Sequence, residues 1–431
     1  MESSKQKNYA LPIAMMIALF FMISFVTGLA NPMGVIVKNQ FGASNFLSQL
    51  GNAANFIAYA FMGIPAGMLL EKIGYKKTAL LAIIIGFFGV GIQYLSGVSA
   101  SFFVYLVGAF VAGFSMCMLN AVVNPMLNTL GGGGKKGNQL IQFGGSINSI
   151  GATIIPVLVG YLMGTNVAER TIDKANPALF MAMGIFALVF VVLYLVNIPE
   201  PHMVKAEKAK EKSKHSALSF RHFILGAAGI FVYVGVEVGI PNISNIFMTT
   251  APEAGGLGID ATIAGTVVGT YWFLMMIGRI FGASLGALFS SKAMLTLASS
   301  LGLLFVLAAI LSPVTTTVSM PVFQSDISFG LAEVPIGIMF LILCGLCTSI
   351  MWGGIFNLAV EGLGKYTAMA SGIFMVMVCG GGILPLLQNG IVDFTGGIGY
   401  LTSYWVIVAG MIYMLYYALI GCKNVNKDIP V

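Results

Sequence analysis

Side-chain amides inside long apolar segments are the first residues of this sequence with evident chemical potential. Burying polar groups among apolar ones is costly, so they are expected to serve either binding or helix packing. An amide offers donors and acceptors together, which suits the hydroxyl groups of a neutral polyol. The alternative is that several of them only join neighbouring helices by hydrogen bonds. The candidates for a binding role are Asn31, Asn120, Asn124, Gln142 and Asn148 in the first half, and Asn357 and Gln388 in the second.

One carboxylate, Glu237, lies about fifteen positions into the apolar segment that begins near residue 222. Desolvation can keep such an acid protonated, whereas a bound cation or a nearby arginine can keep it ionised. Glu237 is therefore a candidate proton or sodium site, or a strong hydrogen-bond partner for a sugar hydroxyl. The alternatives are a structural pair with Arg279 or a helix-packing hydrogen bond. Because Arg279 lies nearer the end of its own segment, it is also a candidate gating residue, acting through Glu361.

Aromatic side chains supply the apolar surface on which a sugar ring can stack, and tryptophan keeps one donor while buried. Trp352, followed by Gly353 and Gly354, is placed to line a cavity. Tyr271 and Trp272 are second candidates. The alternative for all three is a lipid-facing position.

Several kinds of chemistry find no support in the sequence. Cys344 and Cys347 lie three positions apart, but no second pair or nearby histidine completes a metal site. The tract Gly131–Gly134 before Lys135 lacks the spacing of a phosphate-binding loop. No histidine–serine or paired-carboxylate set is available inside the apolar segments, so we expect no enzyme and no metal or organic cofactor. Any driving force should then be an ion gradient, with Na⁺ or H⁺ as the coupling ion.

The elements that must position these residues follow from composition. The chain is 58% hydrophobic and 8% charged, with a mean hydropathy of +0.94, so the lipid bilayer must be the solvent for most of it. Apolar runs begin near residues 11, 46, 78, 101, 139, 177, 222, 262, 292, 334, 367 and 400. We predict an all-α membrane protein with twelve transmembrane helices in two pseudo-symmetric six-helix halves. The halves are expected at residues 1–198 and 222–431, joined by a lysine-rich cytoplasmic linker at 199–221.

The distribution of basic residues predicts the orientation. If both termini are cytoplasmic, nearly all lysines and arginines outside the spans fall on the cytoplasmic face, and only Lys38, Arg170 and Lys174 fall on the other. The long segment from about 313 to 333 has no basic residue and is expected to be an exterior loop. The net charge of +6 is then a topology signal and does not imply nucleic acid.

An internal repeat supports the two halves. The segment from Gly63 to Lys77 aligns with the segment from Gly278 to Lys292 at a shift of 215 residues, with glycines and the final lysine in register. The second copy has Gly286 where the first has Glu71. Repeats of this kind are typical of secondary transporters.

The first copy resembles the signature of the major facilitator superfamily, in the loop after the second helix. A glycine there lets helices approach closely, an acid can cap a helix end, and lysines hold the loop at the cytoplasmic surface. The resemblance implies a loop that latches one conformation and releases in another. The residues that carry it are Gly67, Glu71, Lys72, Gly74, Lys76 and Lys77.

Four further stretches are similar to the fucose–galactose–glucose symporter family: NAVVNP from Asn120, SINSIGA from Ser146, YVGVEV from Tyr233 and GGGILPLLQNG from Gly380. The resemblance covers the chain outside the linker and tails. It implies a monomeric carrier in the bacterial cytoplasmic membrane that imports a monosaccharide or sugar derivative by alternating access, typically with protons.

The sequence departs from that family where proton coupling is expected. Asn31 and Asn120 stand where proton-coupled members carry an aspartate and a glutamate, and Gly145 replaces a glutamine. Sodium coupling, a proton step at Glu237 and uniport therefore stay open. A drug exporter or antiporter of the same fold and a non-transporting sensor are the remaining alternatives; the first would favour more aromatics and fewer amides than this sequence has.

Overall fold

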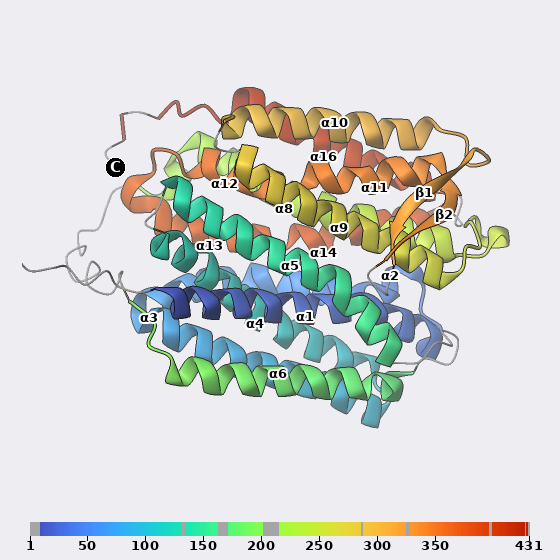
Figure 1. The fold of residues 1–431 in the computed structure, drawn as a ribbon, viewed down its shortest axis with the longest axis horizontal. Coiled ribbons are helices and arrows are strands. Elements are labelled where there is room, and N and C mark those ends of the chain that lie inside the picture. The colour runs from blue at the N-terminus through green and yellow to red at the C-terminus, as the bar shows by residue number, and fades with distance from the viewer. Residues whose placement is uncertain are drawn as a thin grey trace, which may run out of the picture.

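The computed structural model describes residues 9–131, 134–162, 171–200, 215–285, 288–324, 328–395, 399–426 and 428–429. Long helices run side by side along the long axis of the molecule (Figure 1). Eleven helical segments in the described residues are long and apolar enough to cross a membrane, and a shorter apolar segment at Leu140–Ile155 lies within the helix α5. They occur in the order of the twelve predicted spans, which confirms the predicted fold class.

The first half contains five long helices, one of which holds two spans. They are α1 (Ala10–Phe41), α3 (Leu50–Ser99), α4 (Phe102–Leu130), α5 (Gly134–Leu162) and α6 (Asn176–Leu195), with the short α2 (Asn45–Ser48) and a 3-10 turn at Ile172–Ala175. The chain bends inside α3 at Gly74, whose φ of 83° is readily accessible only to glycine. This bend turns the second span into the third.

The second half begins with three unbroken spans and ends with three broken ones. The unbroken spans are α8 (Arg221–Thr249), α9 (Ala261–Leu285) and α10 (Ser291–Leu311). The broken spans are α11 (Ile336–Thr348) with α12 (Met351–Val360), α13 (Thr367–Met377) with α14 (Gly380–Phe394), and α15 (Tyr400–Ser403) with α16 (Trp405–Tyr416) and a π turn at Tyr417–Gly421. Further 3-10 turns lie at Ala217–Ser219, Pro252–Ala254 and Gly364–Tyr366.

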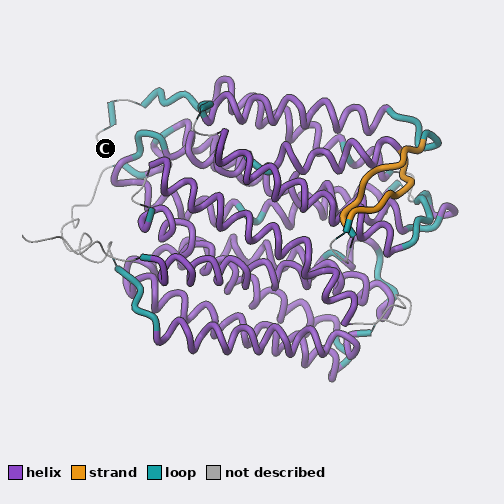
Figure 2. The backbone as a smooth tube through the Cα atoms, in the orientation of Figure 1, coloured by secondary structure: helices purple, strands orange, loops and turns teal. Residues whose placement is uncertain are grey.

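The segment predicted as a plain exterior loop contains a β-hairpin instead. Strands β1 (Thr317–Phe323) and β2 (Phe329–Pro335) pair antiparallel (Figure 2). The alternation of buried Met320 and Val322 with exposed neighbours is the period-two pattern of a half-buried strand. The hairpin packs on α9, where Thr270 accepts a hydrogen bond from the backbone nitrogen of Phe323 at 2.9 Å.

The two groups of helices meet along two seams. Helix α5 packs against α9, and α3 packs against α13 and α14. The hairpin lies at one end of the bundle, and the end of α6, the start of α8 and the C-terminus lie at the other, which we call the linker end (Figure 1). The boundaries 1–198, 199–221 and 222–431 stay a prediction, since most of the linker, residues 201–214, lies outside the described residues.

The signature loop lies at the linker end and is held by a residue that the sequence did not single out. Glu200 accepts hydrogen bonds from the backbone nitrogens of Tyr75 and Lys76, both at 2.8 Å. The Lys76 ammonium donates to the carbonyl of Tyr194 at 2.8 Å. Glu200 thus caps the start of this helix, and the capping role expected of Glu71 stays a prediction. The side chain of Glu71 lies outside the described residues, and Lys72 and Lys77 are exposed.

Candidate functional site

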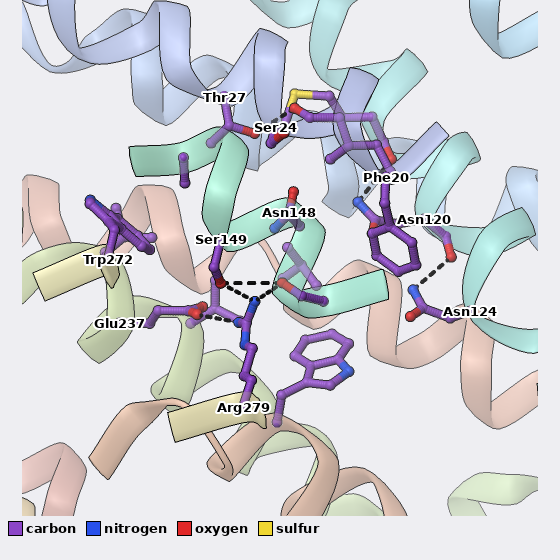
Figure 3. Close-up of a pocket in the computed structure, with 18 of the residues that line it drawn as sticks. Phe20, Ser24, Thr27, Asn120, Asn124, Asn148, Ser149, Glu237, Trp272 and Arg279 are labelled. Carbon is purple, nitrogen blue, oxygen red and sulfur yellow. Dashed lines mark hydrogen bonds and ion pairs between the residues drawn. The ribbon is translucent and has the colours of Figure 1, made fainter. Parts of the chain in front are cut away.

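A central cavity of about 190 Å³ lies between the two halves. Because a single water needs roughly 10–15 Å³ of such space, there is room for a small solute. Side chains from α1, α3, α4, α5, α8, α9, α12 and α13 line it, so both halves contribute (Figure 3). Its polar lining residues are Ser24, Thr27, Tyr59, Asn120, Asn124, Gln142, Asn148, Ser149, Tyr233, Glu237, Trp272, Arg279, Ser349 and Trp352.

The first-half wall presents amides held in fixed orientations. Asn120 donates through its amide nitrogen to the hydroxyl of Tyr59 at 2.8 Å and to the carbonyl of Met116 at 3.1 Å. Asn124 donates in the same way to the carbonyl of Asn120 at 2.9 Å. Since both residues use their nitrogen atoms within the helix bundle, their amide oxygens remain available to accept hydrogen bonds from a ligand.

The amide oxygen of Asn148 is buried without a hydrogen-bond partner among the described residues. A buried acceptor left unpaired costs about 1–3 kcal/mol. Asn148 lines the cavity on α5, one residue before Ser149, so a ligand hydroxyl could supply the missing donor. This wall is therefore incomplete without a hydroxyl-bearing ligand or water.

The second-half wall carries the charges. The Arg279 guanidinium pairs with the Glu237 carboxylate at 3.1 Å, and both side chains are largely buried, with exposed fractions of 11% and 14%. Arg279 also donates from its other terminal nitrogen to the carbonyl of Gly145 at 2.7 Å and to the hydroxyl of Ser149 at 2.8 Å. In Figure 3, dashed lines join the labelled Arg279 to both Glu237 and Ser149. Arg279 thereby joins α8 and α9 of the second half to α5 of the first.

The described contacts of Arg279 do not include Glu361, and a gating role through Glu361 stays a prediction. Glu361 follows α12, and its side chain is exposed. Its backbone carbonyl forms a 2.9 Å hydrogen bond with the imidazole of His222. The crossing of α8 and α9 brings Arg279 to Glu237 instead, although the two residues sit at different positions along their helices.

Two tryptophans complete the second-half wall. Trp352 and Trp272 both line the cavity, and the ring of Tyr233 lies 6.2 Å from that of Trp352. Tyr271 is fully buried, and its ring meets that of Trp272 edge-on at 5.3 Å. The cavity thus has apolar ring faces on the same side as its charged pair.

Two predicted binding residues, Asn357 and Gln388, do not line the cavity, and a third lies outside the described side chains. Asn357 is half-buried in α12 and is not among the lining residues. Gln388 is fully buried in α14, with its amide nitrogen 3.4 Å from the carbonyl of Ser403. Asn31 lies in α1, and its side chain is outside the described residues.

Several lining residues were missed by the sequence reasoning. Tyr233 precedes Glu237 by one helical turn, and Ser149 follows Gly145 by one turn, so each shares a helix face with a recognised residue. Tyr59 carried no comparable signal, because only the hydrogen bond across to α4 reveals its role. Among the described residues, no group of three or more acidic, histidine or cysteine side chains could hold a metal ion.

Spanning helices in two packed groups, with a polar cavity between the groups, define a membrane transporter. Residues 15–385 match the family model of the Major Facilitator Superfamily, and the chain belongs to this family. Family membership agrees with the expectation that the chain is a transporter and not an enzyme. A charged pair inside a cavity that both halves line is the feature that a gradient-driven member would need.

Similar proteins support the resemblance seen in the sequence motifs. The chain is 29% identical to a glucose/galactose transporter of Brucella abortus biovar 1 (strain 9-941), over 98% of this chain and 97% of that one. It is 23% identical to the L-fucose-proton symporter of Escherichia coli (strain K12), over 92% and 90%. These relatives confirm the resemblance to the fucose–galactose–glucose symporters.

Solved structures share the fold. The transporter FucP in its outward conformation matches with a TM-score of 0.72 at 20% identity, over 95% of this chain and 98% of that one. The proton:xylose symporter XylE bound to 6-bromo-6-deoxy-D-glucose matches with a TM-score of 0.67 at 12% identity, over 94% of each chain. At these identities the match concerns the fold alone.

Proposed function

We propose that this chain imports a neutral monosaccharide by alternating access and couples the import to a cation at Glu237. The observation that carries the proposal is the composition of the cavity. Asn120, Asn124 and Asn148, whose amide oxygen is unpaired, line the same cavity of about 190 Å³ as two tryptophans. Amides suit sugar hydroxyls, and indole faces suit the apolar face of a sugar ring.

A neutral cargo is favoured over an acidic sugar because the cavity carries no uncompensated charge among its described lining residues. Among the lining residues that the structure describes, Glu237 is the only carboxylate and Arg279 the only basic residue. Their 3.1 Å pairing satisfies both charges. A sugar carboxylate would have to displace Glu237 from Arg279 and leave that acid buried without its partner, which is costly.

Coupling at Glu237 follows from the same pair. A proton or Na⁺ on the carboxylate weakens its attraction to Arg279, the residue that also joins α9 to α5. Cation binding is thereby linked to the contact between α5 and α9, which must rearrange when the cavity opens to the other side of the membrane. A proton is the favoured ion, since relatives named as L-fucose-proton symporters match over most of the chain.

The remaining features complete the proposal. The carrier is monomeric and lies in a bacterial cytoplasmic membrane, with both termini and the linker end on the cytoplasmic side. The lysine-bearing loop around Lys72, Lys76 and Lys77 then latches the cytoplasmic side in one conformation. An exporter of the same fold is disfavoured by the amide-rich first-half wall.

Uptake into liposomes that hold the purified protein tests the proposal. Labelled glucose, galactose, L-fucose, N-acetylglucosamine and sialic acid are offered under an imposed proton gradient and, separately, under a sodium gradient. We expect one neutral sugar to accumulate under one gradient. Asn120→Leu should abolish sugar uptake, and Glu237→Gln should abolish accumulation while leaving gradient-free exchange.

The matched control is Asn245→Leu, which replaces an amide on α8 that does not line the cavity. This variant should transport as the wild type does. Retained accumulation in both Asn120→Leu and Glu237→Gln would refute the proposed site, and accumulation of sialic acid alone would refute the neutral cargo.

A further inference from the structure

Helix α8 contains a proline one turn after Glu237. In an unbroken helix, the carbonyl of residue 237 would accept the backbone N–H of residue 241. Residue 241 is Pro241, which has no N–H to donate. The carbonyl of Glu237 therefore lacks its usual partner within α8, at the residue that carries the carboxylate of the cavity.

Tyr271 on the neighbouring helix α9 supplies the missing donor to the Glu237 carbonyl. Its hydroxyl donates to the carbonyl of Glu237 at 3.1 Å and lies 3.0 Å from the hydroxyl of Thr348. Thr348 ends α11 just before the break that separates it from α12. The Tyr271 side chain is completely buried, so no water competes for these contacts.

Helix α9 thus holds Glu237 at two points. Tyr271 holds its backbone carbonyl, and Arg279, two turns further along α9, holds its carboxylate. When a cation weakens the second contact, the first still fixes where the carboxylate stands. Without Tyr271, α8 could bend at Pro241 and carry the carboxylate away from Arg279.

We infer that Tyr271 is a positioning residue for cation coupling, which keeps the Glu237 carboxylate in place while Arg279 lets it go. The inference rests on the proposed role of Glu237. The sugar-binding amides Asn120 and Asn148 lie on the opposite wall and do not contact Tyr271. Loss of the tyrosine hydroxyl should therefore lower gradient-driven accumulation more than it lowers sugar exchange without a gradient.

The chain offers a matched control in Tyr404. This residue is equally buried, and its hydroxyl also donates to a carbonyl of α8, that of Ile240, at 3.0 Å. It also contacts the hydroxyl of Ser244 at 2.8 Å. Tyr404→Phe therefore removes the same atom from the same kind of environment without touching Glu237.

The experiment compares two transport readouts in liposomes for each variant. One is gradient-driven accumulation, and the other is counterflow exchange without a gradient. We expect Tyr271→Phe to lower the accumulation ratio about twofold to tenfold, as loss of one hydrogen bond would, while counterflow stays within about twofold. Thr348→Val should lower the accumulation ratio by less than Tyr271→Phe does. Tyr404→Phe should not lower accumulation relative to counterflow. Parallel loss of both readouts in Tyr271→Phe, or the same separation in Tyr404→Phe, would overturn the inference.

A second measurement does not depend on transport. Thermal midpoints of the solubilised protein are recorded for Glu237→Gln, Tyr271→Phe and the double variant, and for the same cycle with Tyr404→Phe. We expect the Tyr271 cycle to be non-additive and the Tyr404 cycle to be additive, because Tyr271, unlike Tyr404, holds the residue whose carboxylate the second variant changes. Additive shifts in the Tyr271 cycle would overturn the inference. A wild type that neither accumulates nor exchanges sugar would refute the proposed function and leave this cycle to decide the inference.

Discussion

Arg279 on α9 donates a 2.7 Å hydrogen bond to the backbone carbonyl of Gly145 on α5, and so joins the two halves beside the cavity. The same guanidinium pairs with Glu237 through its other terminal nitrogen. A charge change at Glu237 therefore acts on a residue that belongs to the seam between the halves. Gly145, where the family resemblance implies a glutamine, lies directly against this guanidinium.

Removing the charge of Arg279 should destabilise the protein, because the carboxylate of Glu237 is then buried without a partner. In Arg279→Gln, Glu237 loses its buried partner and must stay charged without one or take up a proton, and we expect a loss of about 3 kcal/mol in stability, since breaking a buried pair is far more costly than replacing it. The double variant Arg279→Gln with Glu237→Gln should recover much of that loss. Thermal midpoints in detergent measure both; a double variant as unstable as the sum of the singles would contradict the pairing.

Gly145 should tolerate a methyl group but not a long side chain. An added Cβ would lie 3.6 Å from the nearest atoms of Arg279, which is ordinary van der Waals contact. Gly145→Ala should therefore transport nearly as the wild type does. Gly145→Gln would place an amide against the guanidinium, and we expect it to lower gradient-driven accumulation about tenfold, the effect of about 1.4 kcal/mol. Equal activities of the two variants would show that Arg279 does not need this space.

Local signals predicted much of this molecule. Apolar run length gave the spans, and the cost of burying amides pointed to Asn120 and Asn148, both of which line the cavity. The pair of Arg279 with Glu237 was only one of the alternatives that the sequence allowed, because the approach of the two side chains depends on how α8 and α9 cross. The role of Glu200, which bonds to backbone 125 residues away in sequence, and the hairpin, whose register depends on packing against α9, could not be predicted. Contacts between segments far apart in the chain leave no periodic pattern in the sequence that could predict them.

The seam between α3 and α13 makes a further prediction about glycine. A Cβ on Gly63 would lie 2.6 Å from the backbone nitrogen of Val376, whereas one on Gly67 would find nothing closer than the Cα of Gly372 at 3.9 Å. The closest approach thus occurs one turn before the signature glycine. Gly63→Ala should destabilise the protein by about 1–3 kcal/mol, as overpacking does, and Gly67→Ala should be nearly neutral. Thermal midpoints of the two variants, compared side by side, test this; a larger loss in Gly67→Ala would contradict it.

The last prediction concerns Glu200, which follows α6 and caps the start of the third span. Its two carboxylate oxygens accept hydrogen bonds from the backbone nitrogens of Tyr75 and Lys76, just after the bend at Gly74. These nitrogens begin a helix and have no partner within it, so a carboxylate there both satisfies them and meets the positive end of the helix dipole. Glu200→Gln keeps one acceptor but loses the charge and should cost about 1 kcal/mol, while Glu200→Ala should cost about 2 kcal/mol. Glu333→Gln on the exposed face of the hairpin is the matched control and should leave the thermal midpoint unchanged. If Glu200→Gln were as stable as Glu333→Gln, the contacts of Glu200 would contribute nothing to holding the signature loop.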